Sequence, residues 1–261
     1  MSTHVARPSI AGGVTKPLGR KAYGSIGHLP GSKLGPGDHH LDEKQAALLT
    51  HRKNPQHHGA RVVVQQKIDG SCCAVAKIGG VIVPLGRAGY PAATAPYQHL
   101  RDFHVWAVAR ADRFDRLLSE GERVVGEWLS ARHSLEYVER DAVGGYDTRA
   151  DWLESDAAFV AFDIMRDSTR ALHDEVHGRV SAEGLLPAHT FHVGAPTLVA
   201  NAWSTLLDVH TAFRVYPVGE PEGLVYRYEH AGAVKFLGKW VRADFEGRVP
   251  EGGDLREEAA Q

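Results

Sequence analysis

Residues 62–87 read VVVQQKIDGSCCAVAKIGGVIVPLGR, and this stretch constrains the fold more than any other part of the chain. Its runs of β-branched and small apolar residues are interrupted by Asp-Gly and then by the pair Gly79-Gly80. Two glycines between such runs are typical of a two-residue hairpin turn, whose central positions need positive φ. The pattern predicts strands on both sides of this pair. It places Lys67 at the end of the preceding strand, on the wall of a pocket.

A lysine at such a position becomes a nucleophile only if its pKa falls, because a free lysine has a pKa of about 10.4. Burial and neighbouring cations both lower a lysine pKa. The alternative is a strand-end lysine whose ammonium group reaches solvent. The pattern Lys-x-Asp-Gly around Lys67 is too short to decide between these interpretations by itself.

Five further sequence pieces follow Lys67 in a fixed order. They are GRAG with Arg87, VVGEWL with Glu127, FVAFDIM with Phe162 and Asp163, PEGLVYR with Glu222, and AVKFLGKW with Lys235 and Lys239. This set resembles motifs I, Ia, III, IIIa, IV and V of the covalent nucleotidyltransferase superfamily, which comprises ATP-dependent DNA ligases, RNA ligases and mRNA capping enzymes. The gap from Lys67 to Arg87 and the wording FVAFDI and EGLVYR look most like the ATP-dependent RNA ligase family. The resemblance covers residues 62–242.

The resemblance implies an α+β fold, a ligase-type nucleotidyltransferase (adenylation) domain with antiparallel sheets around a nucleotide cleft and flanking helices. We expect a flexible basic leader at residues 1–20, the adenylyltransferase domain at residues 21–243 and an acidic tail at residues 244–261. DNA ligases and capping enzymes carry an oligonucleotide-binding (OB) barrel after this domain. We expect no C-terminal OB barrel here, because 22 residues follow Lys239 and five strands need more.

The resemblance also implies a role for each motif residue. Lys67 would attack the α-phosphate of ATP, and Glu222 would hold Mg²⁺ or Mn²⁺. Phe162 would stack on adenine, Asp69 would orient the site, and Asp163 would be structural. The implied nucleotide-binding set is Gln66, Lys67, Arg87, Glu127, Phe162, Glu222, Lys235 and Lys239. Without the resemblance, core packing would be the preferred interpretation for Phe162. The alternatives are a surface hairpin arginine for Arg87 and a salt bridge for Glu127.

The last motif departs from the family pattern. The family places two lysines two residues apart, but Leu237 follows Lys235 at that spacing. Lys235 is therefore the preferred cation, and Lys239 or Arg242 remains open as the second. These cations would neutralise the triphosphate and help to lower the pKa of Lys67.

Composition excludes several protein classes. The sequence contains no apolar run of eighteen residues and no apolar segment near the N-terminus, so we expect neither a membrane helix nor a signal peptide. The only cysteines, Cys72 and Cys73, are adjacent, which disfavours a disulfide and indicates a reducing, cytoplasmic location. The net charge is −2, yet residues 1–61 hold nine basic and three acidic residues. This segment would supply phosphate contacts, or simply be a solvated leader.

Local patterns predict several further elements. Asp38 would cap a helix through LDEKQAALLTHRK. The apolar spacing over residues 97–120 predicts one helix that buries Trp106 and Phe114. Further helices are expected in residues 169–186 and 198–209, and a loop or short helix in residues 134–152. Four side chains of the first 40 residues would contact a polynucleotide or be ordinary surface groups: Tyr23, Lys33, His39 and His40. The pairs His39-His40 and His57-His58 lack the spacing of a metal site.

These observations predict an ATP-dependent RNA ligase that forms a lysyl-AMP intermediate and joins 5′-phosphate to 3′-hydroxyl ends. The partner would be RNA, with a nicked duplex, an RNA/DNA hybrid or a single strand left open, and no membrane. Two rivals remain. One is a DNA ligase or another polynucleotide nucleotidyltransferase on the same scaffold, and the other is a non-catalytic nucleic-acid-binding module.

Overall fold

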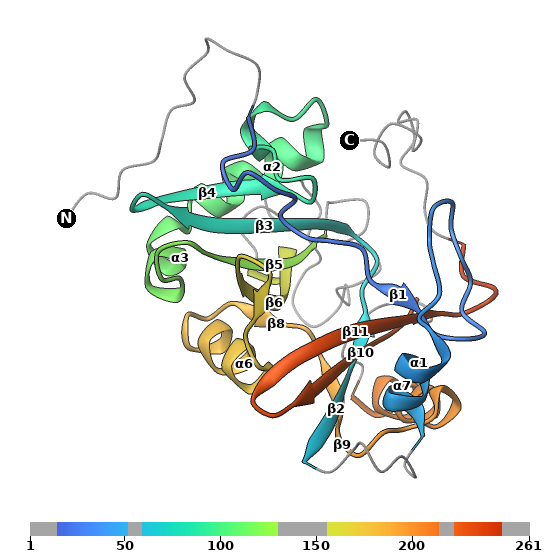
Figure 1. Cartoon of the computed structure of the whole chain (residues 1–261). Coiled ribbons are helices and arrows are strands. Elements are labelled where there is room, and N and C mark those ends of the chain that lie inside the picture. The colour runs from blue at the N-terminus through green and yellow to red at the C-terminus, as the bar shows by residue number, and fades with distance from the viewer. Residues whose placement is uncertain (1–14, 52–58, 130–155, 214–221, 247–261) are drawn as a thin grey trace.

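Two β-sheets form the centre of the molecule in a computed structural model that describes residues 15–51, 59–129, 156–213 and 222–246 (Figure 1). Sheet A runs in the order β1 (Gly27–His28), β11 (Ala233–Val241), β10 (Gly223–His230), β2 (Ala60–Lys67) and β9 (Thr190–Gly194). Sheet B runs in the order β4 (Val81–Gly86), β3 (Ser71–Ile78), β5 (Glu122–Trp128), β6 (Phe159–Arg166) and β7 (Thr169–Arg170), and β8 (Leu186–Pro187) pairs with β6. All strand pairs are antiparallel except β1 with β11 and β6 with β8, so the predicted α+β class is confirmed.

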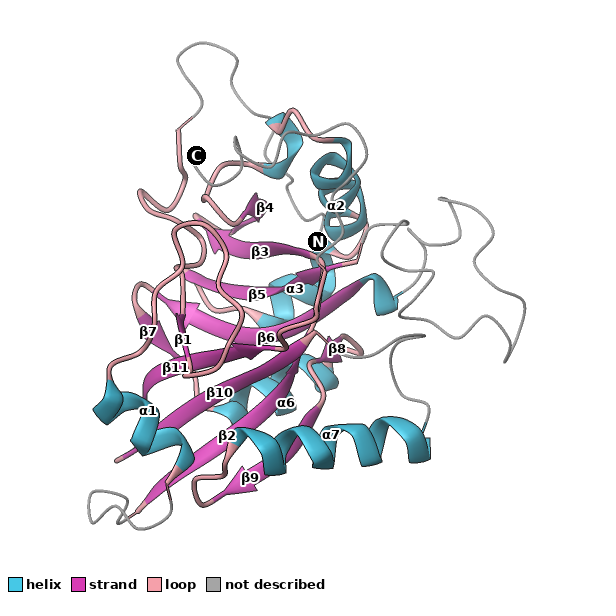
Figure 2. Ribbon diagram, turned by 90° about the vertical axis from the view of Figure 1, so that its right-hand side faces the viewer, coloured by secondary structure: helices cyan, strands magenta, loops and turns pink. Residues whose placement is uncertain are grey.

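Helices cover the outer face of each sheet (Figure 2). Sheet A packs against α1 (Glu43–Thr50) and α7 (Val199–Phe213), and sheet B packs against α2 (Gln98–Val108), α3 (Ala111–Leu117) and α6 (His173–Ala182). Short 3₁₀ turns lie at Ala92–Thr94 and Asp156–Ala158. None of the helices in the described ranges is long and apolar enough to cross a bilayer.

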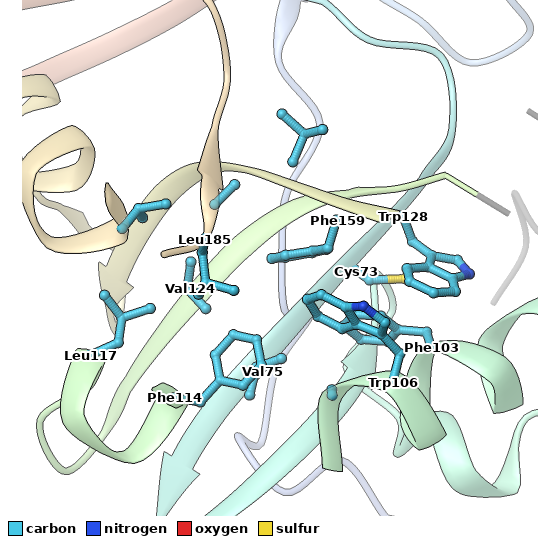
Figure 3. Close-up of a cluster of buried hydrophobic side chains, with 14 of the residues drawn as sticks. Cys73, Val75, Phe103, Trp106, Phe114, Leu117, Val124, Trp128, Phe159 and Leu185 are labelled. Atoms are coloured by element: carbon cyan, nitrogen blue, oxygen red, sulfur yellow. The ribbon is translucent and has the colours of Figure 1, made fainter. Parts of the chain in front are cut away.

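The larger core lies between sheet B and its helices and is rich in aromatic rings (Figure 3). Trp106 from α2 lies 5.6 Å, centroid to centroid, from both Trp128 of β5 and Phe159 of β6. Phe103 and Phe114 are also fully buried. Trp106 and Phe114 are thus packing residues, as the apolar spacing predicted.

The predicted hairpin is present between β3 and β4. Gly79 and Gly80 have φ values of 59° and 74°, which fit the two central positions of a tight turn. The carboxylate of Glu120 accepts hydrogen bonds from both glycine N–H groups, at 2.6 and 2.9 Å. The turn is therefore fixed by its own backbone and by an acidic side chain from the loop after α3.

Two helix predictions need correction. Residues 97–120 form two helices instead of one, because the chain breaks at Ala109 and Arg110 between α2 and α3. Asp38 does not cap α1. The N-cap is Asp42, whose Oδ1 accepts a hydrogen bond from the N–H of Gln45 at 2.7 Å. Asp42 has the spacing that a cap requires, being directly before the first helical residue.

The segment before β1 crosses the inner face of sheet B. Ala22 and Tyr23 are buried there, and Leu18 packs against the same cluster. Arg123 of β5 is itself buried and donates from Nε to the carbonyl oxygen of Ala22 at 2.7 Å. The predicted features at residues 134–152 and at His57-His58, and most of the leader and tail, lie outside the described residues.

Candidate functional site

The inner faces of the two sheets enclose a pocket of about 160 Å³. Six of the eight residues predicted to bind a nucleotide line it: Gln66, Lys67, Arg87, Glu127, Phe162 and Lys239. They come from β2, from the end of β4, and from β5, β6 and β11, which are distant in the sequence. Glu222 contacts the pocket through Lys67, whereas Lys235 lies elsewhere.

Lys67 is the last residue of β2 and forms an ion pair with Glu222, with Nζ 2.7 Å from the carboxylate. The register of the strands explains this contact. Lys67 lies opposite Gly223 at the start of β10, and Gly223 lies opposite Val241 of β11. A Cβ on Gly223 would lie 2.0 Å from the carbonyl oxygen of Trp240, so only glycine lets the three strands meet here.

The electrostatics of Lys67 differ from the prediction. Burial lowers the pKa of its amine, but the carboxylates of Glu222, Glu127 and Asp69 together outweigh burial and raise it. The sequence predicted a lowered value caused by cations. Glu222 lies 2.7 Å from the amine, and the charges that act most strongly on Lys67 are acidic, so its pKa rises.

The same surroundings favour the uncharged form of Glu127, whereas they favour the charged form of Lys67. Burial raises the pKa of Glu127 to about 8, and the nearby carboxylates of Glu222 and Asp69 add to the effect, although the Lys67 ammonium opposes it. Burial likewise raises the pKa of Glu222, against the opposing charge of Lys67. The backbone packs tightly here, because a Cβ on Gly70 would lie 2.8 Å from the carbonyl oxygen of Trp128. One amine and three carboxyl groups therefore form a coupled, pH-sensitive cluster.

A β-bulge places Phe162 in the pocket. The register of β5 and β6 shifts so that Val125 faces Asp163 and Gly126 faces Ala161, which leaves Phe162 as the extra residue. Phe162 is half-buried and lies edge-on to Tyr23, with ring centroids 5.3 Å apart. The two rings form an apolar wall against which a flat base would fit.

The same bulge turns Asp163 to the inner face, where it is fully buried. Its carboxylate pairs with Arg170 and, at 3.1 Å, with Arg227 of β10. Arg227 also donates to the carbonyl oxygens of Phe162 and Ala171, at 3.0 and 3.1 Å. Asp163 thus has the structural role that was expected, and it ties β6 of sheet B to β10 of sheet A.

The sequence favours Lys235 as the cation of the site, but of the two lysines of β11 the structure places Lys239 at the pocket. Lys235 is exposed and sits at a second bulge, where Phe236 faces Tyr228 and Val234 faces Glu229. Lys239 is half-buried, lines the pocket and donates to Asp38 at 3.1 Å. Leu237 lines the pocket as well, so the face of β11 that carries the site is the one with Leu237 and Lys239.

Sequence reasoning missed three contributors to this site: Tyr23, Asp38 and Arg227. Tyr23 was considered a surface contact and Asp38 a helix cap, yet Tyr23 lines the pocket and Asp38 holds Lys239. Arg227 ends the piece PEGLVYR, so its position in a motif was the one available signal. Nothing local in the sequence marks the other two, because they act through contacts with distant strands.

The residues present suit a nucleotide. Gln66 is buried, and its Nε2 makes no hydrogen bond within the described part of the chain, which leaves a donor for a base. Arg87 is exposed at the rim, where its guanidinium contacts the hydroxyl of Ser25 at 3.1 Å. Among the described residues no group of three acidic, histidine or cysteine side chains forms a ready metal site. Magnesium needs only one or two carboxylates when phosphate oxygens and water complete its shell, so Glu222 suits this ion.

Comparisons with known proteins give a family match and several solved structures of related shape. The family model described as RNA ligase matches residues 60–241, more than half of the chain. A Naegleria gruberi RNA ligase variant solved with AMP and Mn has a TM-score of 0.48 and 16% identity, covering 88% of this chain and 61% of that one. An archaeal ATP-dependent RNA ligase has a TM-score of 0.43 and 17% identity, covering 74% and 46%. The chain thus spans less than two thirds of these structures. No curated protein sequence matches it closely enough to count as a relative.

Proposed function

The chain belongs to the RNA ligase family, and we propose that it is an ATP-dependent ligase that joins RNA ends through a lysyl-AMP intermediate on Lys67. The observation that carries this proposal is the pocket between the sheets. It holds an amine, Lys67, within 2.7 Å of a carboxylate and also has an aromatic wall and three further cations, Arg87, Arg227 and Lys239. A covalent adenylate needs each of these parts.

In the first step, the lone pair of Lys67 Nζ forms a bond to the α-phosphorus of ATP. The bond from this phosphorus to the bridging oxygen breaks, and pyrophosphate leaves. Glu222 is 2.7 Å from Nζ, and this ion pair has to open before the amine can lose its proton and attack. The acidic groups raise the pKa of Lys67, so its proton has to leave as the nucleotide binds.

The remaining side chains bind and orient the nucleotide. Phe162 and Tyr23 would flank the base, and Gln66 would donate to it. Glu127 would bind the ribose, and Arg87 and Lys239 the phosphates. A magnesium or manganese ion, held through Glu222, would neutralise phosphate charge when bound.

In the later steps, AMP passes to a 5′-phosphate end, and a 3′-hydroxyl then displaces AMP to seal the strand. RNA is the proposed substrate because the matched family is that of RNA ligases. We infer that residues 21–243 form the adenylyltransferase domain and act in the cytoplasm. Joining of DNA on the same scaffold is the alternative, and parallel assays on nicked RNA, RNA/DNA hybrid and DNA duplexes with a 5′-phosphate separate the two.

Labelling with ATP tests the first step. The protein is incubated with Mg²⁺ and ATP labelled on its α-phosphate, denatured, and examined for bound label. We expect label on the wild type and a loss of at least about a hundredfold in Lys67→Ala, because the attacking atom is removed. Lys77→Ala is the matched control, since Lys77 lies on β3 and pairs with Asp115 at 2.8 Å, away from the pocket. Label that persists in Lys67→Ala, or is absent from the wild type, rejects the proposal.

A further inference from the structure

A segment near the N-terminus holds one of the pocket cations. This segment, residues 27–41, is called the strap below. The Asp38 carboxylate lies 3.1 Å from Lys239 Nζ and 3.0 Å from His28 Nε2. The other ring nitrogen of His28, Nδ1, is 2.6 Å from the hydroxyl oxygen of Ser32. The strap therefore presents a chain of polar contacts that ends at a lysine of the nucleotide pocket.

The strap is fixed to the strand that carries this lysine. His28 of β1 lies opposite Lys239 of β11, and the N–H of Leu29 donates to the carbonyl oxygen of Lys239 at 2.8 Å. The hydroxyl of Ser32 accepts from the N–H of Val241 at 2.9 Å. His28 is almost completely buried, so its ring has little freedom to move. These backbone contacts do not involve the Asp38 carboxylate, so this carboxylate has a separate role.

We propose that Asp38 is a positioning residue that holds the Lys239 ammonium toward the nucleotide phosphates, with the N–H of Gly35 bonded to its carboxylate and His28 packed beside it. The inference rests on the proposed function, in which Lys239 meets the triphosphate. An ammonium group has three N–H donors, so one bond to Asp38 leaves two for phosphate oxygens. A lysine held in this way loses less side-chain freedom when the nucleotide binds.

The charges around Lys239 explain why a carboxylate is needed there. Burial lowers the pKa of Lys239, and Lys67 and Arg87 lower it further, whereas the bond to Asp38 opposes this trend. Burial also acts against the charge on Asp38, but the N–H of Gly35 and the Lys239 ammonium hold its pKa below the usual value. The pair thus keeps both groups charged at the edge of the pocket.

Binding of ATP and of adenosine to Asp38→Asn separates positioning from a general effect on the pocket. Both dissociation constants are measured by calorimetry on the full chain in EDTA, so that no adenylate forms. We expect the ATP dissociation constant to rise about tenfold and the adenosine constant to stay within about twofold, because only ATP reaches Lys239. The KM for ATP in adenylation should rise by a similar factor, with a smaller change in kcat.

Two further variants complete the experiment. Asp42→Asn removes a carboxylate from the same region but keeps an N-cap acceptor, so it should bind ATP like the wild type. Lys239→Met should weaken ATP binding, and adding Asp38→Asn to it should have no further effect if Asp38 acts through Lys239.

Three results would overturn the inference: unchanged ATP binding in Asp38→Asn, equal weakening of ATP and adenosine binding, or additive effects of Asp38→Asn and Lys239→Met. The second of these is also what a misfolded variant would show, and it would assign Asp38 a purely structural role. The measurement is independent of the proposed reaction. A chain that binds ATP in this pattern but never becomes labelled would support the role of Asp38 and reject the lysyl-AMP step.

Discussion

At the scale of single residues, the proposed nucleophile lies among carboxyl groups that raise its pKa. Three carboxyl groups surround Lys67, and their combined charge outweighs burial. A charged amine cannot attack phosphorus, so deprotonation must accompany nucleotide and metal binding. In this site the proposed nucleophile, Lys67, is therefore held in an ion pair with Glu222.

Glu127→Gln is predicted to stabilise the fold at alkaline pH. The pKa of Glu127 is 4.5 in its reference state and about 8 in the fold. The protonated form of Glu127 therefore contributes fully to the free energy of unfolding below pH 4.5. This contribution is lost as the pH rises through about 8. Glutamine mimics the protonated form, so the variant should match the wild type at about pH 5 and exceed it by about 1–3 kcal/mol at about pH 8. Urea denaturation at both pH values measures this, and parallel pH profiles of the two proteins would contradict it.

Lys239→Met and Lys235→Met are predicted to differ sharply, although each removes one lysine from β11. Lys239 lines the pocket and Lys235 is exposed. We expect Lys239→Met to raise the KM for ATP by about tenfold or more, since it removes a charge-assisted contact, and Lys235→Met to change it by less than about twofold. Steady-state adenylation measures both. The reverse ranking would restore the preference derived from the sequence.

At the scale of elements, β-bulges and glycines decide how side chains reach the site. A bulge in β6 turns two consecutive residues, Phe162 and Asp163, to the same face. One then lines the pocket and the other ties the sheets together. Regular alternation would have pointed one of the two toward the opposite face.

A pair of glycine substitutions tests the close packing of the strands. Gly223→Ala places a Cβ 2.0 Å from a backbone oxygen of β11, so we expect a loss of at least about 3 kcal/mol in the free energy of unfolding. Gly178 of α6 has no neighbour within 4 Å of such a Cβ, and Gly178→Ala should stabilise the protein by about 0.5–1 kcal/mol. Chemical denaturation compares the two. If both substitutions change the free energy of unfolding only slightly, β10 and β11 can move apart without loss of stability.

At the scale of the whole molecule, a few buried polar ties hold the sheets and the N-terminal segment around one pocket. Arg227 joins sheet A to Asp163 of sheet B, and Arg123 joins sheet B to Ala22. Tyr23 and Asp38 then bring the N-terminal segment to the pocket itself. The site is therefore complete only when three distant parts of the chain are assembled.

Arg227→Met is predicted to weaken this assembly. Arg227 is 1% exposed, and its removal leaves the buried Asp163 carboxylate with fewer partners. We expect a loss of about 3 kcal/mol in the free energy of unfolding, as for other broken buried ion pairs. Arg116→Met is the control, because Arg116 forms an exposed pair with Glu183 at 2.8 Å and should cost less than about 1 kcal/mol. Equal losses in the two variants would show that the tie between sheets contributes little.

The sequence by itself determined the central strands, the Gly79-Gly80 turn and six of the residues that line the pocket. Its motifs are local, and each lies on a strand whose period of two sets which side chains share a face. Only the tertiary structure decided that Lys239 and not Lys235 lines the pocket, that Asp38 pairs with it, and that Lys67 is charged. Those outcomes depend on bulges and on distances between segments far apart in the chain, because electrostatic and hydrogen-bond energies follow separation in space and not position in sequence.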